Sequence, residues 1–309
     1  MSKLSDLGYF FDDRGVLRTK KDHETFKFTT QENYELLGEA VDEEVYKLLE
    51  NDCRLKREPL KPAGKPDEAE DLSFIFVSEN CQIAENLLVL IHGSGVVRAG
   101  QWARRLIIND NLEAGTQIPY VQRAQEMGWG VVVMNTNLNE SKDEDLKYSR
   151  TPVEHAETVW KTWVEPSAAK KIHVVAHSRG GYDTACVLKK YGGDERISTI
   201  CLTDSPWFEH PKSCAKRQNP LFVVNFLARG SLHSPEFKIK EYSEGMVTNL
   251  FAGTQKHEWS SHCSIDAVFH ILKSGLTVET YQNVLDEAKQ MVQKEKKEED
   301  EPPVKKIRV

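Results

Sequence analysis

The amino-acid sequence predicts an α/β fold in which a mostly parallel sheet is flanked by helices. Apolar runs typical of buried strands alternate with segments of helical periodicity. Several of these runs end directly in glycine or polar side chains, as in the segments HGSG, HSRGG and TDSP. Because ligands bind beyond the carboxyl ends of the strands in open parallel sheets, we expect the functional site at that edge.

The composition is that of an ordinary globular protein. The 309 residues are 39% hydrophobic and 29% charged, which is enough for one large α/β domain with a sizeable core. The net charge of −7 argues against a dedicated nucleic-acid-binding surface. The first residues lack the profile of a secretion signal, and no apolar run has the length of a membrane span. We therefore expect a protein that is soluble or that reaches membranes only through a partner.

The 6 cysteines are spread along the chain without a C-x-x-C pair or a metal-ligand spacing. We interpret them as reduced residues, which fits the cytosol or the nucleus. No metal and no other cofactor is expected.

An extension of about seventy residues precedes the main domain. Gly8–Phe28 has the pattern of a hairpin, and Glu32–Cys53 is amphipathic with helical spacing. The proline-containing segment Lys56–Asp71 is expected to be a linker or surface loop. Residues 1–70 could be a docking module or lid, although simple structural support is an equally good interpretation.

The main domain is expected over residues 71–292. Its predicted strands are Ser73–Val77, Leu87–Ile91, Gly130–Asn135, Ile172–Ala176, Ser198–Thr203 and Met246–Ala252, whereas Leu221–Leu227 fits a strand or a helix. Helices are predicted over Ile118–Glu126, after the capping box of Thr151 and Glu154, after the HSRGG segment and over Leu276–Val292. Leu138–Tyr148 is expected to be a polar loop, and Arg98–Asp110 a solvated face with Trp102 in the core.

The segment Ala176-His177-Ser178-Arg179-Gly180 has the layout of a nucleophile elbow. In such an elbow a buried strand turns sharply into a helix and presents a serine hydroxyl, and small residues on both sides prevent clashes. Alanine replaces the first glycine of the usual pattern. The alternative is an ordinary strand–helix turn in which Ser178 caps the helix.

A glycine-containing loop, Gly93-Ser94-Gly95, follows the apolar run that ends at Ile91. In hydrolases of this architecture such a loop supplies one N–H donor of the oxyanion hole. The residue after the nucleophile, here Arg179, supplies the other.

Ser178, Asp204 and His257 each follow a predicted strand, in the chain order of α/β-hydrolase triads. A serine hydroxyl needs an imidazole to take its proton, and the imidazole needs a carboxylate that fixes its tautomer. His262 is a rival base, and Glu258 could pair with either histidine. The alternative interpretation is that Asp204 merely caps a turn and that His257 is merely a surface loop residue.

Four segments resemble the Arb2 (Arb-two) domain family: Leu87–Ile108, the elbow VVAHSRGG, Leu202–Ser205 and Ala252–Trp259. The similarity extends from about Leu7 to about Leu276. The family includes co-transcriptional regulators catalogued as "family with sequence similarity 172", and a related domain is appended to some histone deacetylases. The resemblance implies an α/β-hydrolase-like fold, Ser178 in the nucleophile position, and association with Argonaute and chromatin-linked splicing machinery.

The sequence departs from the family pattern at two places. Arg179 stands where family members usually have tyrosine, and the chain ends in KKIRV rather than in an endoplasmic-reticulum retention signal. Residence in that compartment is therefore not expected.

Two functions follow as expectations. The first is a nuclear co-transcriptional regulator of RNA processing (alternative splicing) or small-RNA-linked silencing, acting through Argonaute-type and chromatin or splicing partners. It would not bind nucleic acid or membranes directly. The second is a serine hydrolase acting on an ester, thioester or amide. A protein that kept the hydrolase fold but lost catalysis could still serve as a scaffold in the first of these functions.

The charge-rich segment 293–309 is expected to be disordered. Lys305, Lys306 and Arg308 fit a minimal nuclear-localisation pattern, so we expect the protein in the nucleus and also in the cytoplasm. A plain solubilising tail is the alternative.

Overall fold

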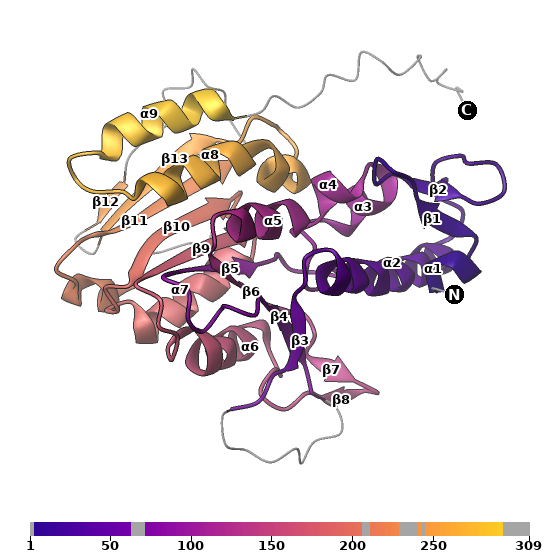
Figure 1. The fold of residues 1–309 in the computed structure, drawn as a ribbon, viewed down its shortest axis with the longest axis horizontal. Coiled ribbons are helices and arrows are strands. Elements are labelled where there is room, and N and C mark those ends of the chain that lie inside the picture. The colour runs from indigo at the N-terminus through magenta and orange to yellow at the C-terminus, as the bar shows by residue number, and fades with distance from the viewer. Residues whose placement is uncertain (1–2, 63–71, 206–210, 229–239, 243–244, 293–309) are drawn as a thin grey trace.

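The chain is described by a computed structural model that covers residues 3–62, 72–205, 211–228, 240–242 and 245–292. Its centre is a 9-stranded sheet in the order β12-β13-β11-β10-β9-β5-β6-β4-β3 (Figure 1). The strands are β3 (Lys56–Pro59), β4 (Phe74–Val77), β5 (Asn86–Ile91), β6 (Gly130–Val133), β9 (Lys171–His177), β10 (Ile197–Thr203), β11 (Leu221–Leu227), β12 (Lys240–Tyr242) and β13 (Gly245–Phe251).

The middle of the sheet is parallel, and its edges are antiparallel. The strands β6, β5, β9, β10, β11 and β13 pair in parallel with one another. At the edges, β4 pairs antiparallel with both β6 and β3, and β12 pairs antiparallel with β13. The exchange of β5 and β6 in the strand order and the antiparallel second strand are features of the α/β-hydrolase fold. The predicted fold class is therefore confirmed.

Helices cover both faces of the sheet. The helices α5 (Ile118–Glu126), α8 (Ser260–Ser274) and α9 (Tyr281–Met291) lie on one face, and α6 (Pro152–Val159) and α7 (Gly180–Tyr191) lie on the other (Figure 1). The chain of α6 continues as a π-helical turn, Trp160–Val164.

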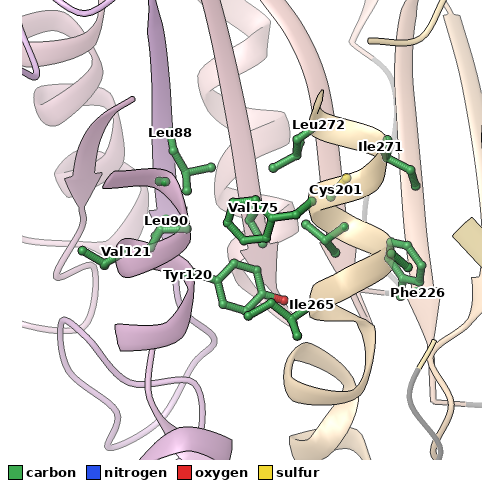
Figure 2. Close-up of a cluster of buried hydrophobic side chains, with 14 of the residues drawn as sticks. Leu88, Leu90, Tyr120, Val121, Val175, Cys201, Phe226, Ile265, Ile271 and Leu272 are labelled. Carbon is green, nitrogen blue, oxygen red and sulfur yellow. The ribbon is translucent and has the colours of Figure 1, made fainter. Parts of the chain in front are cut away.

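The two faces of the sheet have separate cores because successive side chains of a strand point to opposite sides. Leu88 and Leu90 of β5 pack with Tyr120 of α5 and Ile265 of α8 (Figure 2). The alternate residues of the same strand pack with α6 and α7. Burial on both faces explains why the central strands are continuous apolar runs.

The amino-terminal part packs beside one end of the sheet. It consists of α1 (Lys3–Asp6), the antiparallel hairpin of β1 (Tyr9–Phe11) and β2 (Leu17–Thr19), and α2 (Gln31–Asn51). The helix α2 contacts α3 (Arg104–Asn109), which is followed by α4 (Leu112–Gly115). Asp42 of α2 pairs with Arg104 at 2.7 Å, and both side chains are nearly buried.

Some local predictions were wrong. Lys56–Asp71 was expected to be a loop, but β3 forms there as an edge strand of the sheet. In Arg98–Asp110, which was expected to be a solvated face with Trp102 in the core, Trp102 is buried as predicted. Arg104 is buried too, which was not predicted. The polar loop contains a small hairpin, β7 (Glu140–Ser141) and β8 (Glu144–Asp145), and the long helix α8 was not predicted.

All 6 cysteines are buried thiols that form no disulfide, in agreement with their interpretation as reduced residues. Within the described residues, none of the helices combines the length and the apolar character that crossing a membrane requires. The predicted disordered tail and the localisation signal at Lys305, Lys306 and Arg308 lie outside the described residues.

Candidate active site

Two neighbouring parallel strands position the predicted nucleophile and acid. The strands β9 and β10 pair in parallel, with His177 opposite Thr203. Ser178 and Asp204 therefore follow directly at the same edge, and the Ser178 N–H donates to the Thr203 carbonyl at 3.0 Å. Both residues have positive φ angles, 51° for Ser178 and 48° for Asp204. Non-glycine residues seldom adopt this left-handed conformation, which is strained and recurs at functional sites.

The sharp turn at Ser178 depends on small neighbours. A Cβ atom at Gly180 would lie 2.7 Å from the His92 carbonyl oxygen, and one at Gly93 would lie 3.1 Å from the Ser178 Cβ. The glycines thus let the chain after β5 and the start of α7 approach each other closely. The elbow has the geometry predicted from the sequence.

The structure brings Asp204 and His257 together. The His257 Nδ1 lies 2.6 Å from the Asp204 Oδ2, and the Ala228 N–H donates to Oδ1 at 3.0 Å. Burial alone would raise the pKa of Asp204, but these hydrogen bonds outweigh it and hold that pKa below its usual value. The carboxylate is thus ionised at neutral pH and can hold the imidazole in the tautomer that leaves Nε2 free.

The Ser178 hydroxyl is not hydrogen-bonded to His257. Within the described residues Ser178 Oγ has no hydrogen-bond partner, although the side chain of His257 is 48% exposed and accessible. Ser178 itself is only 8% exposed. Of the three predicted triad residues, the structure therefore joins Asp204 with His257 by a hydrogen bond and does not join His257 with Ser178. In free enzymes such a catalytic hydrogen bond often forms only when substrate binds.

The rival residues lie elsewhere. His262 packs edge-on against Trp259, with a ring distance of 5.6 Å, and burial lowers its pKa. Glu258 pairs with Arg105 of α3 at 2.9 Å rather than with a histidine. The structure therefore places His257, and not His262, beside the acid.

The glycine loop after β5 is held by a side chain that the sequence did not point to. Asn137 donates to the Gly93 carbonyl at 2.9 Å, and Gly95 has a φ of 99°. Throughout the described ranges, the N–H groups of Ser94, Gly95 and Arg179 find no backbone acceptor. An oxyanion hole requires N–H groups without a backbone acceptor, and an oxyanion hole is the role predicted for Gly93, Ser94, Gly95 and Arg179.

The guanidinium of Arg179 lies against side chains of α7. Its Nε lies 3.4 Å from Asp183, one turn further, and its Cζ lies 5.1 Å from the ring centre of Tyr182. Asp183 is fully buried, and burial raises its pKa to about 6. The cation of Arg179 is therefore held by residues of its own helix.

His177 is a further site residue that sequence reasoning missed. Its ring centre lies 4.6 Å from that of His257, with an angle of 38° between the planes. The only signal for it was its place directly before the serine. Metal sites are not suggested by the described residues, which contain no group of three or more potential ligands.

Comparisons with known proteins agree with the sequence resemblance. The Arb2 domain matches residues 1–143. A FAM172 family protein homolog of Caenorhabditis elegans is 72% identical over 306 residues, which is 98% of each chain. The human protein named cotranscriptional regulator ARB2A is 32% identical over 340 residues, or 90% of this chain and 81% of that protein.

Solved structures are more distant. The naproxen esterase of Bacillus subtilis is 10% identical, with a TM-score of 0.42, over 76% of this chain and 97% of the esterase. The histone deacetylase Clr3 is 15% identical, with a TM-score of 0.43, over 82% of this chain and 39% of the deacetylase. The fold class and the site described above follow from the strand order and contacts of this chain and not from these distant similarities.

Proposed function

The chain belongs to the FAM172 family of Arb2-domain proteins, and from this premise we propose that it is a nuclear co-transcriptional regulator that carries a serine-hydrolase centre. The first half of this proposal is supported by relatives that are named cotranscriptional regulators and that align over most of the chain. The second half is carried by one observation, the 2.6 Å contact between Asp204 and His257 beside the serine elbow.

As a regulator, the protein would act on alternative splicing or small-RNA-linked silencing through Argonaute-type and chromatin or splicing partners. It would reside in the nucleus and also in the cytoplasm. Affinity purification of the full chain from nuclear and cytoplasmic extracts at low salt tests this role. We expect an Argonaute or splicing factors in the nuclear eluate, and their absence from both eluates would refute it.

As a hydrolase, the protein would cleave an ester, thioester or amide in two steps. The Ser178 Oγ attacks the acyl carbon while His257 Nε2 takes its proton, and the N–H groups of the glycine loop and of Arg179 hold the oxyanion. The leaving group departs with that proton, which leaves an acyl group on the serine. Water then attacks this acyl-enzyme, again with His257 as the base, and releases the acid.

Asp204 makes both steps possible without changing its own charge. It keeps Nδ1 protonated, so Nε2 is free to accept the serine proton, and it stabilises the imidazolium that forms. The lowered pKa of Asp204 keeps the carboxylate ionised throughout the neutral pH range.

A panel of nitrophenyl esters, thioesters and anilides with different acyl chains tests the hydrolase half. We expect turnover of at least one class by the wild type and its loss in Ser178→Ala. Ser274→Ala, on the exposed surface of α8, is the matched control and should keep full activity. Equal rates for the wild type and Ser178→Ala would refute this half and leave a scaffold with a hydrolase fold.

A further inference from the structure

His177 touches several parts of the candidate active site at once. It precedes Ser178 in the chain, and its ring packs against that of His257 at 4.6 Å. A Cβ atom at Gly93 would lie 3.2 Å from its Cδ2, so the ring also supports the glycine loop. One side chain is therefore in contact with the base and with the loop assigned to the oxyanion.

Hydroxyl groups fix the ring of His177 in place. Its Nδ1 lies 3.1 Å from Thr203 Oγ1 and 3.4 Å from Ser261 Oγ, and these two hydroxyls are 2.7 Å apart. Thr203 directly precedes Asp204, and Ser261 lies in the first turn of α8, just after His257. The same small network thus joins the segments that carry the nucleophile, the acid and the base.

The ring of His177 is also uncharged. The side chain is 3% exposed, and its pKa is lowered to about 3, mainly by burial and in addition by the nearby His257. A proton taken up by His257 during the reaction therefore meets no second positive charge in the ring beneath it. A neutral His177 ring therefore does not repel the charged form of His257 that pairs with Asp204.

We infer that His177 is a positioning residue whose ring, held by Thr203 and Ser261, keeps His257 in the orientation that joins Asp204. Its effect on reaction rate rests on the proposed hydrolase centre. Its effect on the His257–Asp204 hydrogen bond does not, so the two can be tested separately.

The test compares two variants of His177 with a matched control in the full chain. His177→Phe keeps a ring against His257, whereas His177→Asn removes the ring. His173→Asn is the control, because His173 is also buried on β9 and stacks at 4.6 Å, but on Trp129 and away from Asp204. Thermal unfolding establishes that each variant is folded.

The first measurement is the downfield NMR signal of the proton between His257 Nδ1 and Asp204, assigned by its loss in Asp204→Asn. We expect this signal in the wild type, in His177→Phe and in His173→Asn, and its loss or broadening in His177→Asn. The inference is overturned if His177→Asn keeps the signal, if the folded His177→Phe loses it, or if the wild type lacks it.

The second measurement is the rate of covalent labelling by a fluorophosphonate. Misplacing a reacting group by about 1 Å can cost about 100-fold, so we expect a loss of that order in His177→Asn and little change in the other two variants. If the wild type is not labelled at all, the hydrolase proposal fails, while the NMR result still decides the role of His177. Should His177→Asn not fold, His177→Leu, which removes the ring but keeps a bulky apolar side chain, takes its place with the same expected loss.

Discussion

Replacing Asp204 by asparagine isolates the charge that the proposed mechanism needs. The variant keeps the shape of the side chain, and its amide oxygen can still accept the Ala228 N–H that now reaches Oδ1 at 3.0 Å. Its amide nitrogen then faces His257 Nδ1 across the present 2.6 Å contact and can only donate. The proton of the imidazole is thereby forced onto Nε2, where it blocks acceptance of the serine proton.

Loss of the correct tautomer in a serine–histidine–aspartate site lowers the rate by about 10⁴-fold. At about 1.36 kcal/mol for each factor of ten, this corresponds to about 5.4 kcal/mol of transition-state stabilisation. We expect a loss of this order in the second-order rate constant of fluorophosphonate labelling at neutral pH, measured by intact-protein mass spectrometry.

Asp194→Asn is the matched control for this prediction. Asp194 is also held by a short charged contact, with Arg196 at 2.7 Å, but it lies in the turn after α7 at the opposite end of β10. It should label at the wild-type rate. If Asp204→Asn labels within about tenfold of the wild type while it remains folded, the carboxylate does not set the tautomer, and the reasoning is refuted.

Three further predictions concern the loop, the amino-terminal part and acid stability. Gly93→Ala should slow labelling, because its Cβ would lie 3.1 Å from the Ser178 Cβ and displace the serine; labelling at the wild-type rate would contradict this. Asp42→Ala should destabilise the fold by about 3–5 kcal/mol in urea unfolding, since it leaves Arg104 buried without its carboxylate. As a control, Glu24→Ala removes one partner of the exposed Glu24–Lys27 ion pair and should lower the stability far less than Asp42→Ala does; equal losses would contradict the prediction. Stability should fall as the pH drops below about 6.5, because buried histidines whose pKa is lowered to about 4 or 3 cannot take up the proton that the unfolded chain binds: His92, His155, His173 and His177. Each should contribute about 2 kcal/mol of lost stability at pH 5, and an unfolding midpoint in urea that does not change between pH 7.5 and pH 5 would contradict this.

Much of the fold was predictable because its signals are local. The central strands are apolar runs, and each ends at a residue that reverses or turns the chain, as at Ser178 and Asp204. Parallel pairing then brings those ends together without any further information. The contact of Asp204 with His257 could be proposed for the same reason, since the chain order and the strand ends matched one architecture.

The features that were missed depend on contacts distant in sequence. The burial of Arg104 requires Asp42, which lies 62 residues earlier on another helix. The strand β3 is polar and lacks an apolar pattern, yet it pairs antiparallel with β4. Its Arg57 lies over aromatic rings from other segments, 4.9 Å from that of Tyr46 and 4.8 Å from that of Phe74. The support of His257 by His177 arises from folding alone, because no sequence spacing relates the two rings.

The central claim is that Ser178 is a nucleophile activated by His257 and Asp204. The most direct measurement is the mass of the intact protein after treatment with a fluorophosphonate, followed by mapping of the modified peptide. We predict a single adduct on Ser178 in the wild type and no adduct in Ser178→Ala. An unmodified wild type, or an adduct on a different residue, would contradict the claim.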